Sequence, residues 1–195
     1  MSMQESNPPV TKLQVTTPTS SYPIYIGSGL LAETGQYLSE TPSISRIEDV
    51  LLVSNETVHP LYGGLVEQQL TDSGRKVHRF IMPDGEQHKS WDMAEQILSF
   101  ALKQRLSRKT AVLALGGGVV GDLAGFAAAV YLRGVPLVQI PTTLLAQVDS
   151  SIGGKVAVNH PLGKNMIGAF HHPELVLADA AVLATLPRRE LTAGL

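Results

Sequence analysis

Short apolar runs alternate with longer segments of helical periodicity along this chain. Continuous apolar runs such as residues 50–53 and 111–115 predict buried parallel strands, because a strand covered on both faces carries no polar alternation. The predicted strands are residues 12–17, 22–26, 50–53, 77–82, 111–115 and 136–140, and the predicted helices are residues 30–38, 58–73, 90–104 and 119–131. This spacing of strands and helices indicates an α/β fold, with a parallel sheet flanked by helices.

Two of the predicted helices carry clear local signals. Ser90 is a good N-cap residue for the helix over residues 90–104, and Gly74 suits the end of the helix over residues 58–73. The buried face of the first of these helices is predicted at an i, i+3, i+4 spacing. It comprises Trp91, Ala94, Ile97, Leu98 and Ala101.

The two ends of the chain differ in character. Residues 1–11 are mostly polar and are expected to fray. Near the other end, Pro187 suits the first turn of a helix, but the pattern stops about two turns later at Leu195, with neither a cap nor a polar tail. We therefore expect a chain that is cut inside an element. The alternative is a short terminal helix packed on the domain.

Composition restricts the class of protein. The 195 residues suffice for one domain, and 15 Lys and Arg against 17 Asp and Glu give a net charge of −2, which excludes the broad positive field that nucleic acid or an anionic membrane requires. The chain has no cysteine, which excludes disulfides and thiolate metal sites and is typical of a reducing compartment. No apolar run approaches the ~20 residues of a membrane span. We expect a cytoplasmic protein without nucleic-acid or membrane partners.

A glycine-rich turn follows the strand predicted at residues 111–115. Gly116, Gly118 and Gly121 have the G-x-G-x-x-G spacing of a phosphate-binding turn, and the next helix would present its positive N-terminal end there. The acid that holds a ribose in the standard dinucleotide fold is missing from residues 139–142, so this is not a standard Rossmann half. Two interpretations stay open: the glycines hold an anion, or they only permit close packing.

Polar residues crowd together after Pro141, where loops at the carboxyl ends of parallel strands would bind a ligand. Lys155 and Lys164 are predicted in glycine-rich loops and, with Asn165, would suit a phosphate or a carboxylate. Two solvated surface lysines are the alternative. A plain helix cap is the favoured interpretation of Asp122, and the alternative for Arg133 is a charge at a helix C-terminus.

The histidines show no spacing typical of a metal site. His171 and His172 are adjacent, so their side chains should diverge, and His160 is the one histidine placed beside the polar segment. The basic run at residues 103–109 falls at a helix end, where it is expected to be solvated.

Five segments together resemble the 3-dehydroquinate synthase family. They are PDGEQHK at residues 83–89, GGGVVGD at 116–122, PTTLLAQVD at 141–149, GGK at 153–155 and NHPLGKNMIG at 159–168. The resemblance implies an N-terminal NAD-binding α/β domain of non-standard Rossmann type. One departure is Val156, where the family usually has threonine.

The resemblance also implies roles for individual residues. Those expected to hold NAD are Asp84, Gly85, Glu86, Gln87, His88, Lys89, Gly118, Val119, Val120, Gly121, Asp122, Thr142, Thr143, Lys155, Lys164, Val182, Leu183, Ala184 and Thr185. Asp149, Lys155 and Asn165 would face the substrate, and Arg133 would reach the active site of the partner subunit in a homodimer.

The implied reaction converts 3-deoxy-D-arabino-heptulosonate 7-phosphate, a phosphorylated sugar acid, to 3-dehydroquinate and phosphate in the shikimate route to chorismate and the aromatic amino acids. NAD oxidises the substrate temporarily, and a divalent metal, zinc or cobalt, polarises the reacting oxygen. The family's metal ligands lie in an all-helical second domain, beyond the position of Leu195, so no metal site is expected in this chain. We expect the chain alone to be inactive. The alternatives are an NAD-binding module without chemistry, a metal-dependent polyol dehydrogenase, and a related sugar-phosphate cyclase.

Overall fold

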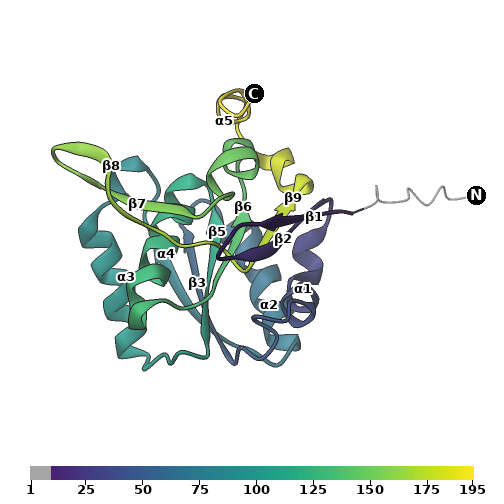
Figure 1. Cartoon of the computed structure of the whole chain (residues 1–195). Helices are drawn as coiled ribbons and strands as arrows, with labels where there is room; N and C mark the ends of the chain where they lie inside the picture. The colour runs from purple at the N-terminus through teal and green to yellow at the C-terminus, as the bar shows by residue number, and fades with distance from the viewer. Residues whose placement is uncertain (1–9) are drawn as a thin grey trace, which may run out of the picture.

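The computed structural model describes residues 10–195, which form a mostly parallel sheet with helices on both faces (Figure 1). This confirms the α/β fold class. The prediction that residues 1–11 fray falls largely on residues 1–9, which lie outside the described residues, whereas Thr11 already begins the first strand.

The main sheet has seven strands within the described residues, in the order β1-β2-β9-β6-β5-β3-β4. They are β1 (Thr11–Thr16), β2 (Ser21–Gly27), β3 (Asp49–Asn55), β4 (Lys76–Met82), β5 (Thr110–Gly116), β6 (Leu137–Pro141) and β9 (Leu175–Asp179). β1 pairs antiparallel with β2, and the other neighbours are parallel. All residues of β5, β6 and β9 are buried, as expected for strands covered on both faces.

Helices cover both faces of this sheet (Figure 1). The α-helices are α1 (Thr34–Glu40), α2 (Gly64–Asp72), α3 (Trp91–Lys103), α4 (Gly118–Val130) and α5 (Arg188–Thr192). Shorter helical turns are η1 (Leu30–Glu33), η2 (His59–Gly63), η3 (Glu86–His88), η4 (Tyr131–Arg133), η5 (Ala146–Ser150) and η6 (Ala180–Thr185). One apolar core joins α3 and α4 to the sheet, and the other joins α1 and α2 to its opposite face.

Local signals in the sequence account for several element ends. The Ser90 hydroxyl accepts a hydrogen bond from the Met93 amide at 3.2 Å and caps α3, a contact typically worth ~1 kcal/mol. Gly74 adopts a left-handed φ of 83° after α2. The prediction that Trp91 belongs to the buried face of α3 is wrong, because Trp91 is 52% exposed. Ala94 and Ile97 of the same predicted face are buried.

The polar segment after Pro141 folds differently from the prediction. Instead of loops, it contains a separate antiparallel hairpin of β7 (Lys155–His160) and β8 (Gly163–Phe170). Lys155 and Lys164 therefore lie on strands. One face of the hairpin is largely exposed, so its strands contain glycine and polar residues. These residues obscure the alternation of apolar and polar positions that would have predicted strands. β9 was not predicted either, because it is a short run between a proline and a helical turn.

A helix glycine allows the hairpin to lie close to the domain. Val156 and Val158 point from β7 into the core, where they pack on α4. A Cβ atom at Gly125 would overlap the side chain of Val156, so only glycine permits this approach. The valine that replaces the family's usual threonine is therefore a buried packing residue.

A short helix forms at the position that Pro187 indicates. α5 begins directly after Pro187, and none of its residues is buried. None of the helices in residues 10–195 combines the length and the apolar character that crossing a membrane would require.

Gly125→Ala is expected to lower the free energy of unfolding. Overpacking costs about 1–3 kcal/mol, which exceeds the gain of about 1 kcal/mol from replacing a helix glycine. Urea unfolding measures the change, and Val156→Ala in the same chain should restore part of it.

Gly64→Ala is the matched control. An added Cβ atom meets no heavy atom within 4 Å there, and the backbone φ is −60°. This variant should keep or raise stability. Equal effects of the two substitutions would contradict the packing role of Gly125.

Candidate functional site

The carboxyl ends of the parallel strands bring the predicted coenzyme segments to one edge of the sheet. Asp84 follows β4, Gly118 opens α4 after β5, and Thr142 follows β6. Thr143 lies beside this turn, since its methyl group would be 3.0 Å from a Cβ atom at Gly117. Segments separated by more than 50 residues in sequence therefore line the same edge, as predicted for a ligand site of an α/β sheet.

A buried lysine connects two of these segments with the hairpin. Lys89 is 6% exposed, and its ammonium group donates to the carboxylate of Asp122 on α4 and to Asn165 Oδ1 on β8, the latter at 2.7 Å. The interpretation of Asp122 as a helix cap is wrong. Asp122 is the fifth residue of α4, whose first turn carries no side-chain cap. Its side chain instead neutralises a buried cation, which would otherwise be costly to desolvate.

The environment of Asp122 raises the pKa of its carboxyl group. Burial has the largest effect and raises this pKa above the ordinary value of 3.8. Lys89 acts in the opposite direction but does not cancel the effect of burial, and the negative charges of Glu86 and Asp149 add to the rise. A carboxylate of this kind binds a proton more tightly in the folded chain than in the unfolded chain.

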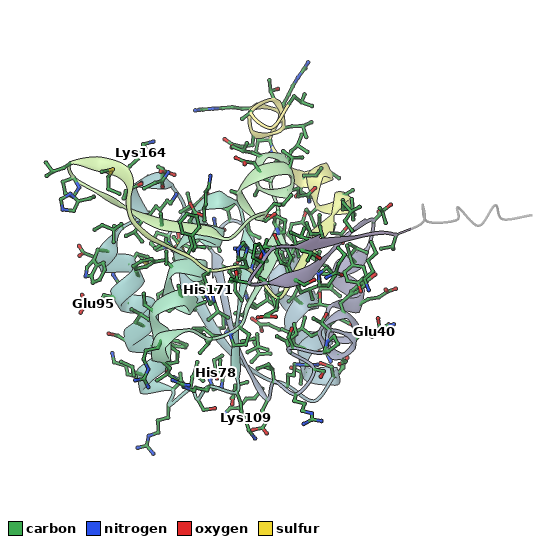
Figure 2. The ribbon with its side chains drawn as sticks, in the orientation of Figure 1. Glu40, His78, Glu95, Lys109, Lys164 and His171 are labelled. Carbon is green, nitrogen blue, oxygen red and sulfur yellow. The ribbon has the colours of Figure 1, made fainter. Side chains whose placement is uncertain are left out.

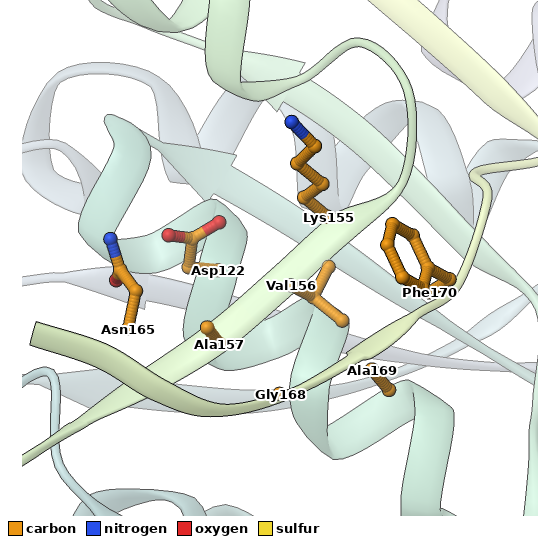
Figure 3. Close-up of a pocket in the computed structure, with 8 residues that line it drawn as sticks. All are labelled: Asp122, Lys155, Val156, Ala157, Asn165, Gly168, Ala169 and Phe170. Carbon is orange, nitrogen blue, oxygen red and sulfur yellow. The ribbon is translucent and has the colours of Figure 1, made fainter.

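A cavity of about 390 Å³ opens between α4 and the hairpin (Figure 3). It is lined by Asp122, Lys155, Val156, Ala157, Asn165, Gly168, Ala169 and Phe170. The close-up shows Asp122 and Asn165 beside each other, while Lys155 extends from β7 above them. A carboxylate, an amide and an ammonium group thus share one space, which suits a small ligand carrying both charge and hydroxyl groups.

The predicted anion-binding lysines are placed differently from each other. Lys155 lines the cavity with Asn165. The Lys164 side chain is 76% exposed, and its Nζ lies 3.9 Å from Glu86 Oε1. Lys164 therefore stands at the solvent side of the hairpin, where Figure 2 labels it far from Lys109 of the basic run and from His78.

The two interpretations of the glycine turn apply to different residues. An added Cβ atom at Gly116 would lie 2.6 Å from Val120 Cβ, and one at Gly121 would lie 3.0 Å from Gln139 Oε1, so these glycines serve packing. In contrast, the first turn of α4, with Gly118, Val119 and Val120, has no side-chain cap. Its amides are available to an anion.

Two residues that the sequence analysis missed hold Asp84. Asn55 Nδ2 donates to Asp84 Oδ1 at 2.7 Å, and Thr57 Oγ1 donates to Asp84 Oδ2 at 3.0 Å. The signal was present in the sequence: Asn55 is the second of two polar residues after the apolar run of β3, at the edge where ligands bind.

The other residues predicted to hold the coenzyme occupy two turns of this edge. Gly85 has a φ of 117°, which explains the glycine, and Glu86, Gln87 and His88 form η3. Val182, Leu183, Ala184 and Thr185 belong to η6 after β9. The hydroxyl group of Tyr62 in η2 donates to the Val182 carbonyl at 3.1 Å and contacts Thr185 Oγ1, so η2 supports this turn.

Asp149 and Arg133 lie outside the cavity lining. Asp149 is an exposed residue of η5, near enough to Asp122 to raise its pKa. Arg133 is exposed three residues beyond the C-terminal end of α4, and that end lies about 12 Å along the helix axis from Asp122 at 1.5 Å per residue. Leu132 and Arg133 have left-handed φ values of 49° and 69°, a strained conformation for residues with side chains.

The histidines do not assemble into a metal site within residues 10–195, where no three His, Cys, Asp or Glu side chains are placed to hold an ion. His160 Nδ1 accepts from the Leu162 amide inside the hairpin turn. His171 Nε2 lies 2.9 Å from the Val135 carbonyl oxygen, whereas His172 lies beside the ring of Tyr22. The two side chains diverge as predicted.

Comparisons with known proteins bear on this geometry. A family model described as 3-dehydroquinate synthase N-terminal matches residues 79–193. A 3-dehydroquinate synthase of Neisseria meningitidis is 54% identical over 183 residues, which cover 94% of this chain and 50% of the relative. This chain thus spans about half the length of the curated relatives it matches.

Solved structures give a consistent result. A 2-deoxy-scyllo-inosose synthase in complex with carbaglucose-6-phosphate, NAD+ and Co2+ is 28% identical, with a TM-score of 0.87 over 94% of this chain and 50% of the other. The 2-epi-5-epi-valiolone synthase of Streptomyces hygroscopicus subsp. jinggangensis, with NAD+ and Zn2+ bound, is 31% identical, with a TM-score of 0.79 over 92% of this chain and 49% of the other.

The raised pKa of Asp122 predicts a pH-dependent contribution to stability. Because the folded state binds this proton more tightly, the contribution is fully present below pH 3.8 and is lost as the pH rises through the folded pKa. The stability of the wild-type chain relative to Asp122→Asn should fall over that range, by at most ~1.4 kcal/mol per pH unit for one proton.

Urea unfolding of both chains at a series of pH values measures this difference. Using the difference cancels the titration of groups that both chains share. A rise in the relative stability of the wild-type chain over the same range would show that Lys89, and not burial, has the larger effect on the pKa of the Asp122 carboxyl group.

Proposed function

Because this chain belongs to the family of 3-dehydroquinate synthase N-terminal domains, we propose that it forms the coenzyme-binding half of an NAD-dependent carbon–oxygen lyase. The enzyme would convert 3-deoxy-D-arabino-heptulosonate 7-phosphate to 3-dehydroquinate and phosphate. The observation that carries this proposal is the cavity that Lys155 and Asn165 line together with Asp122, which directly follows the uncapped first turn of α4.

Two features of the sheet edge fit the diphosphate end of NAD. The amides of the first turn of α4 lack a side-chain cap, and a helix N-terminus favours an anion. Thr142 Oγ1 is buried and has no hydrogen-bond partner among the described residues, so a ligand at this edge would satisfy it. Gly118, Val119, Val120, Thr142 and Thr143 would hold this part of the coenzyme.

The ribose and adenine end would lie further along the same edge. Asp84 is oriented by Asn55 and Thr57, which makes it the acid that the segment after β6 does not provide. Asp84–Lys89 and Val182–Thr185 would then bracket the nucleoside, with Glu86 and Thr185 as polar contacts.

The substrate would enter the cavity between α4 and the hairpin. When bound, NAD would supply reversible hydride chemistry to this site. The chain's own residues would position the substrate: Lys155 and Asn165 offer donors to its charged oxygens, and Lys164 adds positive charge at the entrance. Asp149 would face the substrate from η5.

The described residues do not fit a metal ion, so no step is assigned to a metal that they hold. The similar synthases of known structure bind Co2+ or Zn2+. We propose that a divalent ion, zinc or cobalt, acts in the whole enzyme through ligands outside residues 10–195.

Arg133 is proposed to serve a partner subunit in a homodimer. It is exposed, it lies at the end of α4 opposite Asp122, and it follows another residue in the left-handed region. A side chain held in this way outside its own cavity suits a contact with a neighbouring molecule.

We expect the chain to bind NAD and the variant Thr142→Val to bind it about ten- to a hundredfold more weakly, the worth of one hydrogen bond to a charged diphosphate oxygen. Isothermal titration calorimetry measures the affinity. The stability of this variant should be equal to or above that of the wild-type chain, because no partner in the described chain loses a bond.

Thr110→Val is the matched control, since Thr110 Oγ1 is also buried without a partner but lies at the amino end of β5. Affinity for NAD should be unchanged in this variant. Equal losses in both variants, or no heat from the wild-type chain at millimolar NAD, would overturn the coenzyme assignment.

The purified chain is expected to release no phosphate from the substrate, even with NAD and Zn2+ or Co2+ added. Its described residues contain no cluster of three His, Cys, Asp or Glu side chains placed to hold a metal ion, and the known relatives it matches are about twice as long. A phosphate-release assay with a full-length relative as the positive control measures this. Turnover by the chain alone would show that the described residues suffice for the chemistry.

A further inference from the structure

Asn159 joins the coenzyme loop to the substrate-facing hairpin, and we infer that it is a positioning residue of the proposed enzyme. It lies on β7, touches both segments through side-chain and main-chain bonds, and is absent from the residues assigned above to coenzyme or substrate. This inference rests on the proposed function for what is positioned, namely Glu86 toward the coenzyme and Asn165 toward the substrate.

The contacts of Asn159 use every polar group of its side chain and its amide. The main-chain N–H donates to the Lys89 carbonyl at 2.8 Å, and Nδ2 donates to Glu86 Oε1 at 2.8 Å. Oδ1 accepts from the amide of Asn165 at 3.0 Å. Asn159 therefore holds the loop after β4 on one side and β8 on the other.

The bond to Asn165 stabilises an unusual backbone conformation. Asn165 has a left-handed φ of 57°, which asparagine tolerates better than most residues. In this conformation its N–H reaches Asn159 and its side chain reaches Lys89. Lys89, Asn159 and Asn165 thus form a closed ring of hydrogen bonds, in which each residue contacts the other two.

Of the two contacts that the Glu86 carboxylate makes within the described residues, the hydrogen bond from Asn159 has the better geometry. Lys164, the other partner, lies 3.9 Å away, and both its side chain and that of Glu86 are largely exposed. Exposed ion pairs at this distance contribute little. The amide of Asn159 therefore fixes the orientation of Glu86.

Only a side chain with both a donor and an acceptor can satisfy both neighbours. Aspartate would keep the acceptor for the Asn165 amide, but it would place a second negative charge beside Glu86. Alanine would remove both contacts. The two substitutions therefore separate the two halves of the proposed role.

The test uses Asn159→Ala and Asn159→Asp in the 195-residue chain, with two measurements. NAD affinity is measured by calorimetry, and exchange of the Asn165 amide hydrogen is measured by NMR without coenzyme. Gln68→Ala is the matched control, because it removes an exposed amide–carboxylate bond to Asp72, at 2.7 Å, far along the chain on α2.

We expect Asn159→Ala to weaken NAD binding and to accelerate Asn165 exchange, each about tenfold. Asn159→Asp should weaken NAD binding at least as much but leave Asn165 exchange close to that of the wild-type chain. Gln68→Ala should change neither. A general loss of packing would move both measurements together and would not produce this split.

Combining Asn159→Asp with Glu86→Gln adds a rescue, because the amide introduced at position 86 could donate to the carboxylate at position 159. The affinity lost through Asn159→Asp should be smaller in the Glu86→Gln background than in the wild-type background. Wild-type exchange of Asn165 in Asn159→Ala, or equal acceleration in both single variants, would overturn the inference. If the wild-type chain did not bind NAD, the proposed function would fail, and the exchange split would still decide the positioning role.

Discussion

The ammonium group of Lys89 is almost completely removed from water, and its compensation organises the candidate site. A buried charge is tolerated only with partners close by. Its partners, Asp122 and Asn165, come from α4 and from the hairpin, whereas Lys89 itself follows β4. Neutralising one charge therefore requires three segments to be in place together, and two of them, α4 and the hairpin, line the cavity.

Apolar packing between β7 and α4 also holds the hairpin against the helix. β7 alternates, so that Val156 and Val158 enter the core while Lys155 and Asn159 face the site or its loop. The absence of a side chain at Gly125 lets this strand approach α4 closely. Packing thus sets the distance between helix and hairpin, and the polar network sets the direction of the groups between them. Either alone would leave the cavity wall less well defined.

The sequence predicted most of the sheet and the edge that carries the site. Apolar runs such as residues 111–115 are unambiguous, because strands buried on both faces need them. The hairpin was not predicted, since β8 has one solvated face and its polar and glycine residues resemble a loop. The role of Asp122 was missed for a different reason. Its partner Lys89 is 33 residues away in sequence, and no local pattern encodes a contact that only the tertiary fold creates.

The position of β9 has a consequence for synthesis of the chain. β9 lies between β2 and β6, so β1 and β2 join the sheet only through a strand near the other end, and Gly29 bonds to Asp179 across 150 residues. At translation rates of about 5–20 residues per second, β2 is synthesised roughly 8–30 s before its neighbour β9. Until β9 is present, the edge of β2 that pairs with it has no partner in this sheet and must not pair elsewhere. The hairpin of β1 and β2, although synthesised first, can therefore join the sheet only after β9 is made.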